Sequence, residues 1–574
     1  MRLNNFSNIE QKSKFGWADI IVIFLLLAIL YAAAKLGSAM EVPFSAVQQP
    51  KISLNPIWLP YYAGRSLLRM FIAFAASLIF TFVYGRIAAY NKTAEKIMIP
   101  AIDILQSVPV LGFLSATVLA FMALFPGSLL GVECASIFAI FTGQVWNMTF
   151  SFYHSLQTIP RELDEATKMN RLGTWNRFTK LEVPFSMIGL VWNSMMSFGG
   201  GWFFLAASES ISVLNQNIHL PGIGSYMALA ADQGNIRAII YSILAMIILI
   251  VLVDQLFWRP IIEWSQKFKI ELTESGEIPT SWVFNIVRRA RFVQYLSRNL
   301  RRVLHDWMIE LTKKSSQMAF PEIPGLIKKS IKWLLVVLVA AVVCKYLYEG
   351  IILVSKLSWP ELTNAILLGL LTSLRVFIST LLAVIWTLPV GVFIGTNPKL
   401  SRIAQPIVQI LASFPANMAF PIITILYLKL KISMEIGAIP LMMLGTQWYV
   451  LFNVIAGAMA IPSDLKEASS ILKLSRRQKW KTLILPAVFP FLITGCITAS
   501  GGAWNASIVS EIVSWKSSTL QASGLGSYIA QATTKGNWPE IIWGIIVMCV
   551  LVVFVNRLLW RRLYDLAQRK YHLD

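Results

Sequence analysis

Charged residues are scarce in this chain of 574 residues, and acidic residues are the scarcest. Charged residues make up 14% of the chain, with 29 Asp and Glu against 50 Lys and Arg, whereas 56% of residues are hydrophobic. A soluble globular domain carries about 25% charged and about 45–50% apolar residues. The deficit of charge excludes a soluble fold and indicates a protein that crosses a membrane several times.

Cysteines are few, and the common catalytic signatures are absent from the sequence. The sequence contains no G-x4-G-K-[ST] phosphate loop, no HExxH and no GxSxG. The chain alone is therefore not expected to be an enzyme, and ATP would have to bind another polypeptide. Its four cysteines stand in apolar runs without CxxC pairing, which argues against a disulfide framework or a metal site; they are Cys134, Cys344, Cys496 and Cys549.

About twelve apolar runs are long enough to cross a bilayer of about 30 Å. A cleaved signal peptide is the alternative for the first run, but about 20 apolar residues exceed a signal core of about 7–15. A retained anchor is therefore favoured. We expect an all-α polytopic membrane protein with two sets of six spans, which begin near Trp17, Ser66, Ile97, Cys134, Pro184 and Ala238, and near Trp333, Ala365, Ile403, Ile436, Ile484 and Ile541.

The basic excess, a formal charge of +21, lies at the ends of the runs and in a few loops. This placement follows the positive-inside rule and argues against nucleic-acid binding. Six spans per set bring both termini, the linker and the basic loops to one face, which the positive-inside rule makes the cytoplasmic face. In the linker, residues 266–327, apolar residues at helical spacing among Arg and Lys predict an amphipathic helix on the membrane surface, with a plain tether as the alternative.

The two sets of spans are copies of each other. A constant offset of 302 residues joins the stretch 161–184 to 463–486 and the motif GIGSY (222–226) to GLGSY (524–528). Upstream, an offset of 306 joins further matched positions, among them Arg69 and Arg375. Such a register predicts two parallel repeats, residues 1–265 and 328–574, around a pathway at their interface.

Each of the stretches 161–184 and 463–486 contains Glu-Ala and, 19 residues after the Glu (184 − 165; 486 − 467), a Pro. Both stretches resemble the EAA loop of inner-membrane permeases of binding-protein-dependent ABC importers. The resemblance implies that each loop docks as a coupling helix on an ATPase subunit through Glu165, Ala166 and Thr167, and through Glu467, Ala468 and Ser469. The family's Gly, six residues after the Glu, is replaced here, which predicts an altered turn; the residues concerned are Arg171 and Lys473, with Gly173 and Ser475 two positions further on.

The segments ILQSVPVLGF and SES…GIGSY…GN resemble the nitrate, sulfonate, taurine and bicarbonate branch of these permeases. This resemblance implies the channel-forming subunit of an importer that receives a small anion from a periplasmic or extracellular binding protein. Two ABC ATPase subunits on the cytoplasmic side would hold MgATP, and no cofactor is expected on this chain. A permease for iron or thiamine, an ion-coupled secondary transporter and a membrane scaffold are the alternatives.

Ionisable, kinked or polar positions within spans are candidates for the solute pathway. Arg69 and Arg375 would offer two guanidinium groups to an oxyanion, or would extend to the outer headgroups. Pro109 and Pro415 are expected to kink the third span of each repeat. Further candidates for the pathway, with helix packing as the alternative for the tryptophans, are Gln144, Trp146, Asn147, Gln447 and Trp448. Candidates for docking of the binding protein, with solvated rim charges as the alternative, are Glu133, Glu435, Glu209 and Glu511.

Overall fold

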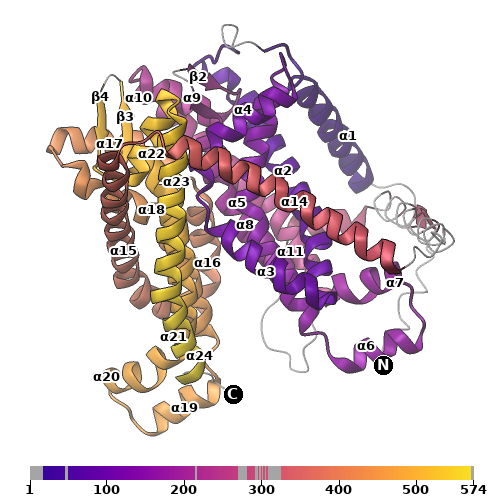
Figure 1. The fold of residues 1–574 in the computed structure, drawn as a ribbon. Coiled ribbons are helices and arrows are strands. Elements are labelled where there is room, and N and C mark those ends of the chain that lie inside the picture. The colour runs from indigo at the N-terminus through magenta and orange to yellow at the C-terminus, as the bar shows by residue number, and fades with distance from the viewer. Residues whose placement is uncertain are drawn as a thin grey trace. The chain divides into compact units, whose positions relative to one another are not determined.

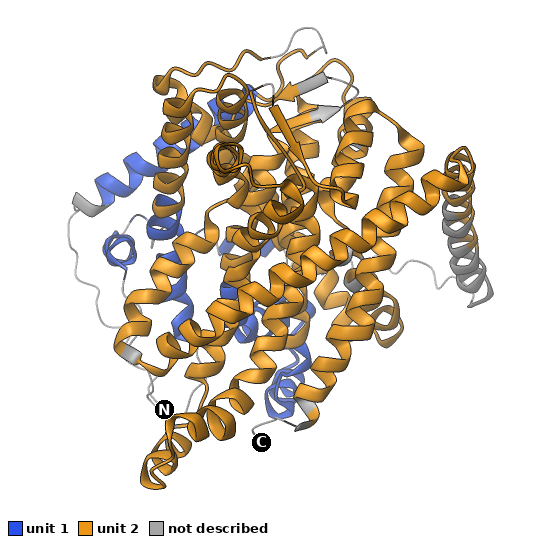
Figure 2. Ribbon diagram, turned by 90° about the vertical axis from the view of Figure 1, so that its left-hand side faces the viewer, with its two compact units in different colours: residues 1–39, 155–192, 252–330 blue, residues 40–154, 193–251, 331–574 orange. Residues whose placement is uncertain are grey.

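The computed structural model describes residues 17–44, 50–213, 216–268, 281–290 and 325–570, together with isolated positions from 292 to 310. The chain divides into two compact units (Figure 2). The smaller unit lies within residues 1–39, 155–192 and 252–330, and the larger within residues 40–154, 193–251 and 331–574. This division differs from the repeats expected at residues 1–265 and 328–574, because helices of both repeats pack together in the larger unit.

Helices dominate the described residues, which confirms the all-α class (Figure 1). Each apolar run of the sequence holds a helix or a bent pair of helices. In the first repeat these are α1 (Trp17–Ser38), α2 (Leu59–Tyr90), α3 (Lys92–Ser107) with α4 (Leu114–Leu124), α5 (Leu130–Gln157), α8 (Val183–Ser208) and α10 (Ile236–Val253). In the second they are α14 (Gly325–Val354), α15 (Trp359–Thr396), α16 (Pro398–Ser413) with α17 (Phe420–Leu430), α18 (Met434–Met459), α21 (Leu485–Ser510) and α23 (Trp538–Val555).

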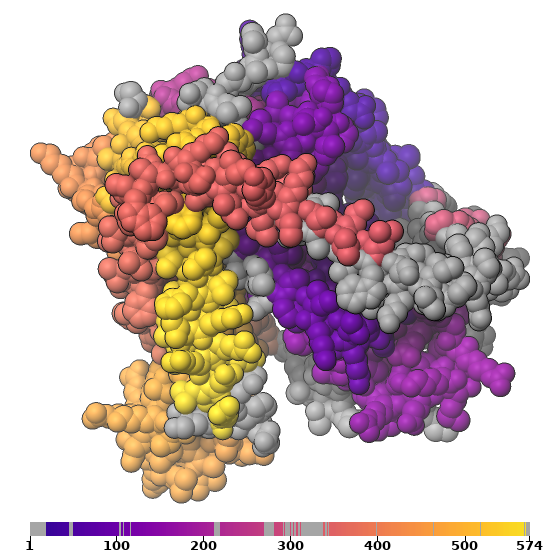
Figure 3. Space-filling view, in the orientation of Figure 1, coloured from indigo at the N-terminus to yellow at the C-terminus, as the bar shows by residue number. Residues whose placement is uncertain are grey.

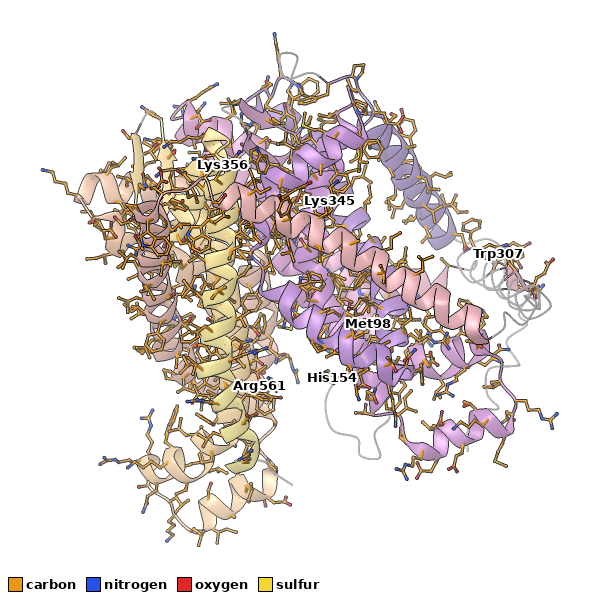
Figure 4. The ribbon with its side chains drawn as sticks, viewed as in Figure 1. Met98, His154, Trp307, Lys345, Lys356 and Arg561 are labelled. Carbon is orange, nitrogen blue, oxygen red and sulfur yellow. The ribbon has the colours of Figure 1, made fainter. Side chains whose placement is uncertain are left out.

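Within the described ranges, seven helices are long and apolar enough to cross a membrane by length and composition, or up to eight if the bent pair α16–α17 forms one span. The remaining expected spans are also helical; they are α3 with α4, α5, α8 and α14. Basic side chains flank the spans of the second repeat, since Lys356 follows α14 and Arg561 begins α24 (Arg561–Lys570) (Figure 4). A polytopic membrane fold is therefore common to the sequence and the structure.

In each repeat, one short hairpin follows the fifth span, and the sequence did not predict it. Strands β1 (Ser210–Val213) and β2 (Gln216–His219) pair antiparallel, with Ser210 opposite His219. Strands β3 (Ile512–Trp515) and β4 (Ser518–Gln521) pair in the same way, with Ile512 opposite Gln521. Each hairpin leads into a short helix, α9 (Ile223–Asp232) or α22 (Leu525–Lys535).

The third span of each repeat is broken at the expected proline. Pro109 precedes a 3-10 turn at Val110–Gly112, and Pro415 precedes one at Ala416–Ala419. Proline removes a backbone donor and disfavours the helical conformation of the residue before it, so both helices end in extended backbone there. The two arms around Pro415 are bent by 74°. The prediction of a kink is confirmed, and the kink is a complete break.

The largest hydrophobic cluster of the larger unit joins both repeats. It includes Val132 and Ala139 of α5 together with Leu441 and Met442 of α18. A matched pair of tryptophans is almost fully buried, with 1% of Trp202 and 2% of Trp504 exposed. Large side chains that pack between membrane helices gain many van der Waals contacts, so these matched positions anchor the fifth span of each repeat.

In the smaller unit, α1 is tied to the linker. Asp19 of α1 is buried and accepts a 2.7 Å hydrogen bond from the backbone N–H of Phe292. The helix α12 (Trp282–Arg289) begins at a Ser281 cap, and Trp307 further along the linker is exposed (Figure 4). Most of the amphipathic segment expected within 266–327 lies outside the described residues, and its place on the membrane surface stays a prediction.

Candidate functional site

The two EAA-like loops each form a helix, a turn and a shorter helix. In the first loop, α6 (Arg161–Met169) is followed by α7 (Thr174–Arg177). In the second, α19 (Ser463–Ile471) is followed by α20 (Arg476–Lys479), which lie together at one end of the second repeat (Figure 1). Pro160 and Pro462 precede the first helix of each pair. Proline fits a helix start because the first backbone N–H groups have no partner within the helix.

The turn in each loop keeps the conformation that glycine favours, although glycine is replaced. Arg171 and Lys473 both lie in the left-handed region, with φ of 47° and 48°. The N–H of Arg171 bonds to the carbonyl of Lys168, and the matching bond joins Lys473 to Ser470. This pattern closes a helix when the residue after the cap is left-handed. The prediction of an altered turn is therefore wrong, because the hydrogen bonds of the helix end impose the turn on a cationic residue.

Both loops expose apolar side chains at matched positions. Leu163 and Leu465 are 38% and 39% exposed, and Met169 and Ile471 are 84% and 80% exposed. Exposed apolar side chains grouped on one short element are typical of a docking surface. Most of the positions predicted for coupling are also exposed; they are Glu165, Ala166, Arg171, Gly173, Glu467, Ala468, Lys473 and Ser475. The exceptions are half-buried Thr167 and buried Ser469, whose hydroxyls donate to carbonyls of their own helices.

Ion pairs hold the first loop at positions where the second loop has no acidic residue. Asp164 lies 2.6 Å from both Lys168 and Arg177, and Arg177 lies 3.2 Å from Glu182. The hydrogen bond from Lys168 and the charge of Arg177 lower the pKa of the Asp164 carboxyl. The positions 302 residues after Asp164 and Glu182 hold Lys466 and Ile484, neither of which is acidic. In the second loop Ser475 and Gln478 cap α20 instead.

A buried ionic cluster fixes the opposite end of the first repeat. The Glu133 carboxylate binds Arg65 and, at 2.5 Å, Arg69. Arg69 also lies 2.7 Å from Glu209, and all four side chains are fully buried. Ser66 donates a 2.5 Å hydrogen bond to Glu209. Two cations balance two carboxylates, so the charges compensate each other out of contact with water.

The second repeat builds the same cluster with one cation fewer. Arg375 pairs with Glu435 and lies 3.0 Å from Glu511. Thr372 donates a 2.8 Å hydrogen bond to Glu511, as Ser66 does to its matched carboxylate. Leu371 replaces the second arginine, and 45% of the Glu435 side chain is exposed. The uncompensated carboxylate is thus the one that reaches solvent.

The glycines of GIGSY and GLGSY make room for these carboxylates. Glu209 accepts a 2.7 Å hydrogen bond from the backbone N–H of Gly224, and Glu511 accepts one of 2.8 Å from Gly526. A β-carbon at Gly222 or Gly524 would overlap the adjacent carboxylate. Backbone N–H groups at a helix start favour an anion. Here that anion is an internal side chain, which excludes these helix starts as the place where a solute anion binds.

The clusters change the interpretation of the charged candidates. Arg69 and Arg375 do not offer free guanidinium groups to an oxyanion, because each is neutralised by two carboxylates of its own repeat. Glu133, Glu209 and Glu511 are buried rather than lying on a solvated rim, so their side chains are not available at the surface to a docking protein. Among these four carboxylates, only that of Glu435 is partly exposed.

The repeats meet at the broken third spans. The backbone N–H of Val110, just after the first break, donates a 2.8 Å hydrogen bond to Asn505 Oδ1 of α21. After the second break, Asn417 Nδ2 donates a 3.3 Å hydrogen bond to the Phe203 carbonyl of α8. Pro109 and Pro415 therefore stand at the interface between repeats, where a pathway was predicted.

The remaining pathway candidates are divided. Trp146 packs against Phe80 of α2 and Trp448 against Trp386 of α15, so both contact the second span of their own repeat. Gln144 is buried beside Met70, and Gln447 accepts a 3.1 Å hydrogen bond from Trp386. Asn147 is exposed on α5. The structure therefore leaves Asn147 as the candidate of this group that is open to a passing solute.

Sequence reasoning missed several members of these sites. Ser66 and Thr372 carry a detectable signal, since both are small hydroxyl residues joined by the same offset of 306 as Arg69 and Arg375. Arg65 has no matched partner in the second repeat, and its role follows only from its contact with Glu133.

Comparison with known proteins gives two matches along the chain. The family model described as "Binding-protein-dependent transport system inner membrane component" matches residues 64–257 and again residues 387–572. These ranges correspond to the two repeats. Each range includes one EAA-like loop and one broken third span. The first range includes all of its ionic cluster, whereas Thr372 and Arg375 of the second cluster lie before residue 387.

Three curated relatives share part of this similarity. The nitrate import permease protein NrtB of Leptolyngbya laminosa is 28% identical over 184 residues, which are 32% of this chain and 62% of that protein. The bicarbonate transport system permease protein CmpB of Synechococcus elongatus is 26% identical over 176 residues, 31% of this chain and 60% of the relative. The taurine transport system permease protein TauC of Escherichia coli is 25% identical over 192 residues, 33% and 66% of the two chains. The chain thus spans less than two thirds of the length of each relative.

We expect Arg69→Met to lower the free energy of unfolding by about 3–5 kcal/mol, because it leaves buried carboxylates without a compensating charge. Equilibrium unfolding of the detergent-solubilised protein measures this loss. Arg237→Met, at an exposed arginine, is the control. Adding Glu209→Gln to Arg69→Met should restore part of the loss. A loss below about 1 kcal/mol for Arg69→Met would contradict compensation inside a buried cluster.

We expect Arg171→Gly and Lys473→Gly each to raise the free energy of unfolding by about 1 kcal/mol, because glycine enters the left-handed conformation without a steric penalty. The midpoint of thermal unfolding measures the gain. Asn170→Gly is the matched control, since Asn170 has a φ of −78° and glycine there adds only conformational freedom to the unfolded chain. Destabilisation by both glycine substitutions would show that the cations stabilise the turns.

Proposed function

Because the chain belongs to the family of binding-protein-dependent transport system inner membrane components, we propose that it is the channel-forming subunit of an ATP-driven importer. Both halves of the pathway would then stand on one polypeptide, in a bacterial inner membrane with both termini cytoplasmic. A small anion is the solute that the relatives support, since three of them are named for nitrate, bicarbonate and taurine.

The single observation that carries this proposal is the pair of matched loops. Each presents an exposed glutamate, two exposed apolar side chains and a left-handed cation in the same order along the chain. Ordinary cytoplasmic turns would not be expected to expose apolar side chains at matched positions in both repeats. Exposed apolar side chains are costly in water unless a partner covers them. Two ATPase subunits, one for each loop, are the partners that fit.

Each loop is placed to pass a movement to the interface between repeats. The first loop connects α5 to α8, and the second connects α18 to α21. Helices α8 and α21 make the hydrogen-bonded contacts with the broken third spans of the other repeat. MgATP on the partner subunits would supply the energy, and rocking of the two repeats would open the interface alternately to each side.

The buried clusters would let each repeat move as a rigid body. In the first repeat, charged and hydrogen-bonded contacts join α2, α5 and the start of α9 at the end opposite the loop. Breaking such a buried network is costly, so rearrangement is expected elsewhere. The outer surface would receive a solute-binding protein, and the partly exposed Glu435 is the carboxylate of the four original candidates that is still open to such contact.

An ion-coupled secondary transporter is the second candidate function. It needs a membrane-buried carboxylate that gains and loses a proton or binds a cation. Buried carboxylates are present, but Glu133, Glu209 and Glu511 are each bound by arginine. A carboxylate that is held as half of an ion pair is a poor proton carrier, because protonation would leave the arginine uncompensated.

We expect Glu165→Arg combined with Glu467→Arg to release the ATPase subunits, because a reversed charge would stand in the middle of each docking helix. The measurement is co-purification of this chain with candidate ATPase subunits, followed by ATP hydrolysis. The wild type should retain the ATPase, and the double variant should lose most of the bound ATPase and of the stimulated hydrolysis.

The matched control for that experiment reverses two exposed carboxylates outside the loops, with Glu349→Arg and Asp565→Arg. This control should keep the ATPase. If the loop variant keeps both its partner and its stimulated hydrolysis, the loops are ordinary turns, and an ion-coupled secondary transporter becomes the favoured function.

We expect uptake of a labelled anion into proteoliposomes to require ATP together with the binding protein. Nitrate, bicarbonate and taurine are the test solutes. Hydrolysable ATP should drive accumulation that a proton or sodium gradient does not replace. Accumulation driven by a gradient without ATP would contradict the proposed function and favour ion coupling.

A further inference from the structure

One side of α21 is polar within a membrane-spanning helix. Thr494, Thr498, Gly501 and Asn505 follow each other at intervals of four, three and four residues, which places them on one face. Thr494 is exposed and Thr498 is half-buried. A side chain at Gly501 would meet no atom within 4 Å. This face is therefore open along about three turns of the helix.

The open face is on the side of α21 that contacts the first repeat. Asn505, on the same face, receives the hydrogen bond from Val110 of the first repeat. One turn further, Ile508 of α21 lies against Gly112 of the same broken span. Helix α21 also packs against α24, and the surface is hollowed between α24 and α3 (Figure 3). Thr494 and Thr498 are therefore on the side of α21 that meets the first repeat.

The matched face of α8 is apolar. Subtraction of 302 places Trp192, Met196, Gly199 and Phe203 at the corresponding positions. Gly199 is covered by Ser413 of the second repeat, whose Oγ would lie 2.9 Å from an added β-carbon. Among these four side chains, the indole of Trp192 is the one hydrogen-bond donor. The interface is therefore asymmetric, although the two repeats share one fold.

The neighbouring fourth spans carry the same asymmetry. Asn147 of α5 is exposed, and its counterpart in the second repeat is Tyr449. Tyr449 is half-buried, and its hydroxyl lies 3.0 Å from the place of a β-carbon at Gly200 of α8. A polar amide is thus open to solvent in the first repeat, where the second repeat fills the interface with an aromatic ring.

The polar face can donate hydrogen bonds without a large rearrangement. Thr494 Oγ1 donates to the Pro490 carbonyl at 3.0 Å, and Thr498 Oγ1 donates to the Thr494 carbonyl at 3.1 Å. A helical carbonyl also accepts a backbone N–H, so it stays satisfied when the hydroxyl turns to another acceptor. Asn505 Nδ2 makes a long, 3.4 Å bond to the Gly501 carbonyl. Three uncharged groups with available donors therefore follow each other along the open face.

We propose that a small oxyanion crosses the membrane along this face of α21, passing Asn505, Thr498 and Thr494 in sequence. The pathway then has one hydrogen-bonding wall, formed by the second repeat, and an apolar wall formed by α8. Uncharged donors at several successive positions bind an anion weakly enough to release it, which conduction requires. The identity of the anion rests on the proposed function, whereas the opening of this face to water does not.

Thiol accessibility tests the opening directly. Thr494→Cys and Thr498→Cys are made in a full-length background in which Cys134, Cys344, Cys496 and Cys549 are Ala. The probe is the anionic reagent 2-sulfonatoethyl methanethiosulfonate, applied to permeabilised membrane vesicles. Val550→Cys on α23, which is 61% exposed on a strongly apolar span, is the lipid-facing control. We expect both threonine positions to react at least about 10-fold faster than the control, since an anionic thiol reagent does not enter lipid.

Transport tests the hydrogen-bonding role. We expect Thr494→Val combined with Thr498→Val to raise the KM for the imported anion about 10-fold or more, because two donors are lost with little change in volume. The matched control is Thr363→Val with Thr396→Val on α15, two exposed threonines whose hydroxyls also donate to carbonyls of their own helix, and it should change the KM less than about 2-fold. Stimulated ATP hydrolysis should be equal in the two double variants, which separates a pathway effect from faulty coupling.

The two failures are distinguishable. If the cysteines at 494 and 498 react as slowly as the one at 550, the face contacts lipid and the inference is overturned, whatever the chain transports. If they react quickly but the valine variants import normally, the face is wet but does not carry the anion, and the inference is again overturned. If the wild type imports none of nitrate, bicarbonate or taurine while both cysteines react quickly, the proposed solute class fails and the open pathway stands.

Discussion

Compensation of buried charge is the constraint on which each repeat depends. Arg69 and Arg375 each hold two carboxylates that come from distant parts of the chain. Glu209 and Glu511, which follow the fifth spans, also accept a hydrogen bond from a backbone N–H at the start of a short helix. Removal of one partner would leave a charge without compensation in a poorly solvated place. The second span, the fourth span and the segment after the fifth are thereby fixed to one another.

One end of each repeat is held by buried charge, whereas the contacts between the repeats are of other kinds. Those described above are a shared hydrophobic cluster, hydrogen bonds of backbone and amide groups, and close packing at glycines. The hydrogen bonds are individually worth about 0.5–1.5 kcal/mol, so they can exchange when the repeats move against each other. The division between a rigid charged end and an adaptable neutral interface suits a protein whose halves rock against each other.

Much of this organisation was predictable because it depends on local pattern. The breaks at Pro109 and Pro415 follow from the chemistry of proline, and the matched loops follow from a repeat that subtraction reveals. The turn at Arg171 and Lys473 was not predictable, because a cation in a glycine position suggests a different turn. The hydrogen bonds of the helix end outweigh the penalty of about 1–2 kcal/mol for a left-handed residue.

The sequence by itself determined the membrane class, the two repeats and the position of the EAA-like loops, since composition and periodicity are local properties. The tertiary structure decided what the charged residues do. Arg69 is 64 residues from Glu133 and 140 from Glu209, so no pattern in the chain shows that they meet. It also decided that the side of α21 that carries the threonines meets the other repeat at Asn505. The sequence shows which side chains are charged. Whether such a charge is paired with an opposite charge depends on contacts that form only when the helices pack.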